Sequence, residues 1–186
     1  TRYTNENGWY DCDKVRFRQG TPEKIGGWRS FTQTFYGVCR SLWNWTTLGS
    51  QNLIGIGTNQ KFYINQGGTN YDVTPIRATY LLVANPFTTV SGSATVTVYD
   101  STGGYLIGDW VTFSGAAVFN GVTMNGEFQI DTVDSLTNTY TVTATTTATG
   151  SGTGGGAAVQ AEYQINIGPA IAVPFSGWGA GGWGIP

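Results

Sequence analysis

The sequence contains no histidine, and this absence excludes several kinds of active site. Ser-His-Asp and Cys-His nucleophile systems need an imidazole, as do a neutral-pH imidazole base and a His-ligated zinc ion. With only two cysteines, the chain cannot supply a four-cysteine metal site either. We therefore expect no catalytic residue, no metal and no cofactor, and we predict that the protein is not an enzyme.

Charged residues and long apolar runs are also scarce. Charged side chains make up 11% of the 186 residues, less than half of the roughly 25% found in soluble globular chains. No uninterrupted aliphatic run is longer than that of Leu81 to Ala84, whereas a membrane-spanning helix needs about 20 apolar residues. The sequence predicts no membrane span.

The two cysteines leave two states open. Cys12 and Cys39 can form one disulfide that closes a long loop, or they can be two reduced, partly buried thiols. Two cysteines in a chain of this length are not a disulfide framework, which favours free thiols. They identify no cellular compartment.

Glycine and aromatic residues are abundant. The chain has 28 Gly, about twice the usual ~7% share, and aromatic residues make up 14%. Aromatic and β-branched side chains suit a pleated, half-buried surface, while glycine supplies turns. The composition predicts an all-β protein.

Charge divides the chain into two parts. All nine basic residues lie in residues 1–77 together with five acidic ones, a formal charge of +4, whereas residues 78–186 carry six acidic residues and no Lys or Arg. Such asymmetry indicates two modules with different neighbours. The alternative explanation is that a Thr/Gly-rich β-domain needs few basic residues.

The first part, residues 1–85, is predicted to be an antiparallel meander of the β-propeller-blade type. Residues 14–18 alternate strictly, so one strand face carries the cations Lys14, Arg16 and Arg18. Residues 19–22 form a turn, and further short strands are expected within 37–45, 52–58, 60–65 and 71–75. The predicted core consists of Val15, Phe17, Trp28, Leu53, Ile54 and Ile56.

The second part, residues 86–166, is predicted to be a small inserted β-barrel or sandwich. Its deletion should then leave the first part folded. Strands are expected within 93–99, 108–113, 126–131, 139–144 and 158–166. The Asn-Gly pairs at 120–121 and 125–126 indicate turns in an exposed loop, and the Thr/Gly/Ser stretch 145–156 indicates a flexible tip. Residues 167–186 form a Gly/Trp-rich return segment, in which Trp178 and Trp183 are expected to anchor against a neighbour.

Residues 9–28 resemble the N-terminal signature of a bacteriophage tail-hub family, the nozzle or packaged-DNA-stabilisation proteins of short-tailed phages. The resemblance rests on the run Trp9-Tyr10-Asp11-Cys12-Asp13-Lys14-Val15-Arg16-Phe17-Arg18 followed by Gly20 and Pro22-Glu23-Lys24-Ile25-Gly26-Gly27-Trp28. Weaker similarities follow at 37–45, 55–58 and 71–77. The Trp/Gly-rich end is similar to the point at which the family resumes its propeller.

The resemblance implies a β-propeller core with insertions, assembled as a hexameric ring below the portal and adaptor of the virion. A propeller needs about 40 residues per blade, so four blades do not fit beside the insertion. We expect this chain to be the N-terminal part of a longer protein, the alternative being a reduced relative. Residues 108–116 resemble a β-module common in phage tail proteins. The usual His-Gly-Leu of that module is Gly104-Tyr105-Leu106 here, which weakens any side-chain role.

Three groups of residues are candidates for function. The face of Lys14, Arg16 and Arg18 is expected to contact an adjoining subunit, although contact with DNA phosphates or plain solvation are alternatives. Asp11 and Asp13 lie about 6.5–7 Å apart on one strand face, within the range of a glycosidase pair, but ion pairing with the cations explains them more simply. Trp43 and Trp45 are able to stack sugars, although core or interface packing is favoured.

The sequence therefore favours a structural virion protein, a ring-forming subunit of the tail hub at the head–tail junction that helps close the portal channel and retain DNA. Its expected partners are copies of itself, the portal, the adaptor and other tail proteins, with non-specific contact to packaged DNA. The alternative is a phage adhesin, a receptor-binding and carbohydrate-binding β-module.

Overall fold

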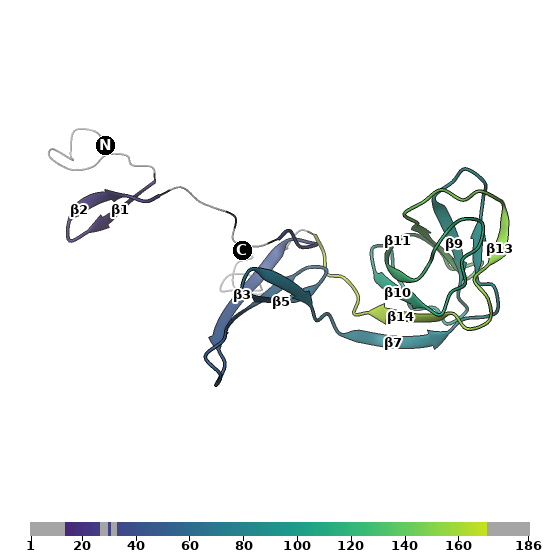
Figure 1. Ribbon diagram of the computed structural model, residues 1–186, viewed down its shortest axis with the longest axis horizontal. Helices are drawn as coiled ribbons and strands as arrows, with labels where there is room; N and C mark the ends of the chain where they lie inside the picture. Colours follow the sequence, from purple (N-terminus) through teal and green to yellow (C-terminus); the bar gives the residue numbers. More distant parts are fainter. Residues whose placement is uncertain (1–13, 27–29, 31–32, 171–186) are drawn as a thin grey trace, which may run out of the picture. The chain divides into compact units, whose positions relative to one another are not determined.

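The structure is a computed structural model that describes residues 14–26, 30 and 33–170 (Figure 1). The chain divides into two units, Thr1–Gln33 and Thr34–Pro186. The regular secondary structure of the described residues consists of β-strands, all of which pair antiparallel. The all-β prediction is confirmed. In the described part of the chain, no helix has the length and apolar character to cross a membrane.

The first unit contains the hairpin of β1 (Val15–Arg18) and β2 (Thr21–Lys24). Its two-residue turn places Gln19 and Gly20 at φ values of 50° and 81°, the left-handed conformation that tight hairpins require. The predicted strand is confirmed, with the turn shorter than predicted. Phe17, predicted as core, is exposed, because the described part of this unit offers no second layer to cover it. Val15 is half-buried, and Trp28 lies outside the described residues.

A four-stranded meander begins the second unit. Its strands are β3 (Cys39–Thr46), β4 (Asn52–Thr58), β5 (Phe62–Gln66) and β6 (Thr69–Asp72), and each pairs with the next in sequence order. The prediction of a meander is confirmed for these four strands, whereas β1 and β2 form a separate two-stranded sheet. Ile56 is buried as predicted, whereas Leu53 and Ile54 are half-buried. A complete propeller is not present in the described residues.

An eight-stranded sheet follows and curls into a half-barrel (Figure 1). In the order β13-β8-β9-β12-β11-β10-β14-β7, its edge strands are β13 (Gly152–Gly154) and β7 (Ile76–Leu81). The strands between them are β8 (Phe87–Thr89), β9 (Thr95–Tyr99), β10 (Trp110–Ser114), β11 (Gly126–Asp134), β12 (Thr139–Thr143) and β14 (Gln160–Gln164). Alternate side chains of these strands form one hydrophobic core, which includes the fully buried Val98, Val111 and Val142.

One loop prediction is wrong, and another is confirmed only in part. The stretch 145–156, predicted as a flexible tip, contains β13 and packs against the core: a Cβ at Gly155 would lie 2.5 Å from the buried ring of Phe87. Glycine is needed there for close packing as well as for turning. The 120–121 turn is confirmed by positive φ at both residues, but the loop is not simply exposed, because Val122 and Met124 are fully buried.

The chain leaves the meander and returns to it at one place. After Pro75 it enters β7, and after β14 the amide of Ile165 donates to the carbonyl of Pro75 at 2.9 Å. All eight strands of this sheet therefore lie between these two hydrogen-bonded residues. The module boundaries predicted from sequence, 85/86 and 166/167, stay predictions. The hydrogen bond between Ile165 and Pro75 suggests a second pair of boundaries, directly after Pro75 and directly before Ile165.

Candidate functional site

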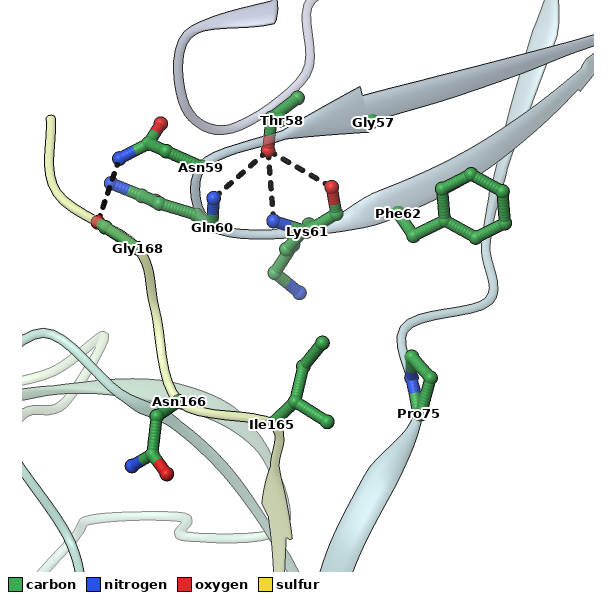
Figure 2. Close-up of a pocket in the computed structure, with 10 residues that line it drawn as sticks. All are labelled: Gly57, Thr58, Asn59, Gln60, Lys61, Phe62, Pro75, Ile165, Asn166 and Gly168. Carbon is green, nitrogen blue, oxygen red and sulfur yellow. Dashed lines mark hydrogen bonds between the residues drawn. The ribbon is translucent and has the colours of Figure 1, made fainter. Parts of the chain in front are cut away.

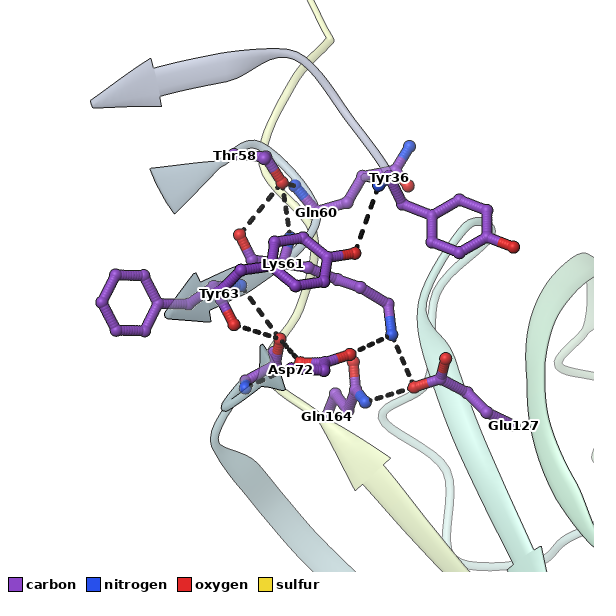
Figure 3. Close-up of polar contacts among 10 residues, drawn as sticks. Tyr36, Thr58, Gln60, Lys61, Tyr63, Asp72, Glu127 and Gln164 are labelled. Atoms are coloured by element: carbon purple, nitrogen blue, oxygen red, sulfur yellow. Dashed lines mark hydrogen bonds and ion pairs between the residues drawn. The ribbon is translucent and has the colours of Figure 1, made fainter. Parts of the chain in front are cut away.

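A buried lysine marks the junction between the two sheets of the second unit (Figure 3). Lys61 lies in the tight turn between β4 and β5. The hydroxyl of Thr58 accepts hydrogen bonds from the amides of Gln60 and Lys61 at 3.1 and 2.8 Å and donates to the carbonyl of Lys61 at 3.0 Å. This turn fixes the backbone from which the lysine side chain extends.

The ammonium group of Lys61 joins two carboxylates. Its Nζ lies 2.6 Å from Asp72 Oδ2 and 2.6 Å from Glu127 Oε1, and the side chain is only 1% exposed. It also lies 4.3 Å from the centre of the Trp110 ring. Glu127 on β11 accepts a further hydrogen bond from Gln164 Nε2 on β14 at 2.6 Å. One cation therefore ties the four-stranded meander to three strands of the half-barrel.

The junction is ionised at neutral pH. Burial by itself lowers the pKa of Lys61, but the hydrogen bonds and charges of Asp72 and Glu127 outweigh it, so the pKa lies above its ordinary value of 10.5. Burial raises the pKa of Asp72, yet hydrogen bonds from Lys61 and Thr74 bring it below 3.8. A lysine held protonated is no nucleophile, so this arrangement is suited to holding two sheets together.

A pocket of about 410 Å³ lies beside the junction (Figure 2). Phe62, Pro75 and Ile165 give it apolar walls. Its polar groups come from Asn166 and from the turn that precedes Phe62. The volume is in the range of small-molecule sites, about 300–1,000 Å³. Lys61 lines this pocket, but its ammonium group already has two carboxylate partners and so offers no free charge to a ligand.

Two other carboxylates are buried in the half-barrel, and hydrogen bonds account for both. Asp109 accepts from the amides of Leu106 and Ile167 at 2.9 and 3.2 Å and from Asn166 Nδ2 at 2.7 Å. It thereby ties the return segment to the sheet. Asp100 accepts from the hydroxyl of Tyr163, whose pKa is raised by burial. Both carboxylates therefore have partners within the fold.

The predicted basic face is only partly described. Arg16 lies opposite Glu23 in the hairpin, and its Nη2 lies 2.9 Å from the carboxylate. Lys14 and Arg18 are exposed, with Lys14 preceding β1 at a φ of 56°. The interface role of this face stays a prediction. The other predicted positions Asp11, Cys12, Asp13, Trp178 and Trp183 lie outside the described residues.

Neither metal-binding clusters nor disulfides appear in the described part of the chain. Its His, Cys, Asp and Glu side chains include no group of three or more that could hold a metal ion. Cys39 is an exposed free thiol at the start of β3, and its Sγ donates to the carbonyl of Ser41 at 3.7 Å.

An aromatic surface covers one face of the meander. The strand register aligns Trp43, Gly55, Ile64 and Tyr71 across the four strands, so they share this face. The rings of Trp45 and Phe62 lie over the central glycine, where a Cβ would meet them at 3.2 and 3.6 Å. The sequence indicated only the two tryptophans, although the alternation of β5 and β6 places Phe62 and Tyr71 on the same face once the register is known. We call these four aromatic residues the aromatic face.

Comparisons with known proteins include a distant structural similarity. No protein-family model and no curated protein matches the chain. Among solved structures, the phage phi92 endosialidase matches with a TM-score of 0.41 and 22% sequence identity, over 69% of this chain and 18% of that protein. This chain therefore spans about a fifth of that protein's length. The function proposed below rests on the chain's own residues.

Proposed function

We propose that this chain is a structural component of a bacteriophage tail, and not an enzyme. The observation that carries the proposal is the aromatic face. The rings of Trp43, Phe62 and Tyr71 on this face are exposed. None of the strand residues whose side chains lie on this face, from Ser41 on β3 to Tyr71 on β6, is charged. A sheet in water normally buries such a face against another layer, and an exposed apolar patch marks an assembly surface.

The specific role is that of the tail hub or nozzle, which the signature at residues 9–28 resembles. In this proposal the meander is one blade of a larger propeller, and the half-barrel is a module displayed from it. Copies form a hexameric ring against the portal and adaptor at the head–tail junction, where they help to retain DNA. The subunit contact includes Lys14, Arg16 and Arg18, together with Trp178 and Trp183.

The location of the protein in purified particles tests this role. An affinity tag at the end of the chain is labelled with gold and imaged by electron microscopy. Label at the head–tail junction is the expected result, together with heads that lose DNA when the gene is disrupted. Particles without the protein would overturn the proposal.

The aromatic face also favours a second candidate, a carbohydrate-binding adhesin. Exposed aromatic rings stack against the apolar faces of sugars, and Trp43 and Tyr71 lie on the two edge strands of the meander, on a face whose strand residues carry no charge. The gold label would then lie at the distal end of the tail. A glycan array probed with the chain and with a Trp43→Ala, Tyr71→Ala variant tests it, since binding must be lost in the variant.

A further inference from the structure

Strand β3 is an unusually open edge of the meander. Among the described residues it pairs on one side alone, with β4, and it is eight residues long. The opposite edge, β6, has four residues and carries Asp72, and Pro75 follows it closely. Short length, charge and proline are the usual protections of an edge strand against pairing with another chain. Strand β6 has these protections, whereas the centre of β3 lacks them.

Strand β3 presents an exposed apolar side chain on each face of the sheet. Leu42 is 65% exposed on one face and Trp43 is 75% exposed on the other. No charged residue occurs between Ser41 and Thr46. The neighbouring Arg40 directs its guanidinium to the carbonyls of Pro169 and Ala170 at 3.1 and 2.5 Å.

We propose that a second copy of this chain docks on β3, by antiparallel pairing of the β3 strands of two copies around a two-fold axis. Two identical edges in this arrangement present matching donors and acceptors, because the contact is isologous. The two meanders then form one continuous eight-stranded sheet. Trp43 of both copies lies on the same face, and Leu42 of both lies on the other.

The charge of β3 supports this occupant over others. Around a two-fold axis the central residues of the strand face their own copies, so a charge there would repel its copy. Strand β3 carries no charge between Ser41 and Thr46. A nucleic acid would need cations at this edge to neutralise its phosphates. The contact differs from the predicted ring interface on β1, so the two are tested separately.

Sedimentation of the full chain over a range of concentrations tests the inference. We expect a dimer that dissociates on dilution, and an at least roughly tenfold weaker association for Trp43→Lys or Leu42→Lys, because a charge at an edge strand opposes pairing. Both side chains are exposed, so the variants should retain the wild-type circular dichroism. Leu136→Lys, at an exposed position between β11 and β12, is the matched control and should leave the dimer intact.

The Tyr71→Lys variant separates pairing at the β3 edge from packing of the aromatic face. Tyr71 lies on that face but on the far edge of the sheet, so its replacement should leave a β3 dimer unchanged. Hydrogen exchange of the β3 amides should slow as the dimer forms. A chain that stays monomeric, or a dimer that Tyr71→Lys dissociates as strongly as Trp43→Lys does, would overturn the inference. Neither result would bear on the proposed function, which the gold labelling of particles tests separately.

Discussion

Replacement of Lys61 by methionine tests whether the buried cation joins the two sheets. Methionine keeps most of the length and apolar volume of the lysine stem but removes the charge. Asp72 and Glu127 then lose their shared partner, whose Nζ lies 2.6 Å from each carboxylate. We expect a chain that folds with lower stability.

The size of the loss follows from the contacts. Two charge-assisted hydrogen bonds disappear, each with a net contribution of about 1.5–3 kcal/mol. The two carboxylates remain 33% and 32% exposed and keep hydrogen bonds from Thr74 and Gln164. Water therefore recovers part of the loss. We expect about 2–3 kcal/mol, below the roughly 3–5 kcal/mol for a fully buried pair that loses one member.

Urea unfolding and thermal melting measure this difference. For a unit of this size about 2–3 kcal/mol corresponds to a decrease in Tm of roughly 4–12 °C. The control is Arg16→Met, which removes the exposed pair with Glu23 and should cost at most about 1 kcal/mol. If Lys61→Met unfolded within about 0.5 kcal/mol of the wild type, a range typical of neutral surface substitutions, the junction would contribute no net stability.

Three further predictions concern the pH dependence of this junction, a closely packed glycine and the basic face. Because the pKa of Lys61 is raised and that of Asp72 is lowered, the junction should stabilise the fold fully between about pH 4 and 10. Urea titrations should show its contribution fall as pH drops through the folded-state pKa of Asp72, below 3.8, and as pH rises through that of Lys61, above 10.5. The Lys61→Met variant should lack both dependences. Gly155→Ala should cost about 2–4 kcal/mol in urea unfolding, because it adds a clash with Phe87 to a left-handed backbone. Gly67→Ala, also left-handed but in open space, should cost only about 1 kcal/mol. Arg16→Glu with Arg18→Glu should leave the chain folded but absent from particles, as judged by mass spectrometry of purified virions. Normal incorporation would show that this basic face is only solvated.

Strict alternation predicted the strands that bury one face. The prediction at 93–99 corresponds to β9 (Thr95–Tyr99), where Val96 and Val98 are fully buried, and the one at 139–144 corresponds to β12 (Thr139–Thr143). Period two is a local property of the chain, so it is visible in the sequence. Strand β7 was missed because Ile76–Leu81 is an edge strand with a mixed pattern, and β14 is needed to order it.

Burial and partnership depended on contacts distant in sequence. Alternation placed Phe17 on an apolar face, but burial needs a second layer, and a two-stranded hairpin does not supply one. For Lys61 the difference runs the other way: a lone lysine in a turn is ordinarily exposed, whereas this one is buried. Its partners are 11 and 66 residues away, and only the tertiary fold brings Glu127 on β11 to the ammonium group that Asp72 also contacts. The site was therefore not predictable from local pattern.

The last prediction concerns where the half-barrel can be removed. Deletion of residues 86–166, at the boundaries predicted from sequence, leaves β7 without β14 and exposes Ile76, Tyr80 and Leu81 further.

Deletion of residues 76–164 with a two-glycine linker removes both strands together. It joins Pro75 to Ile165, which are already hydrogen-bonded. Lys61 then keeps Asp72 and becomes a surface ion pair. We expect the second deletion to give a soluble monomer or β3 dimer with β-type circular dichroism, and the first to aggregate more readily through its open β7 edge. Equal solubility and equal urea midpoints for the two deletions would show that β7 does not depend on β14, and the module boundary would then lie at residue 85 as the sequence predicts.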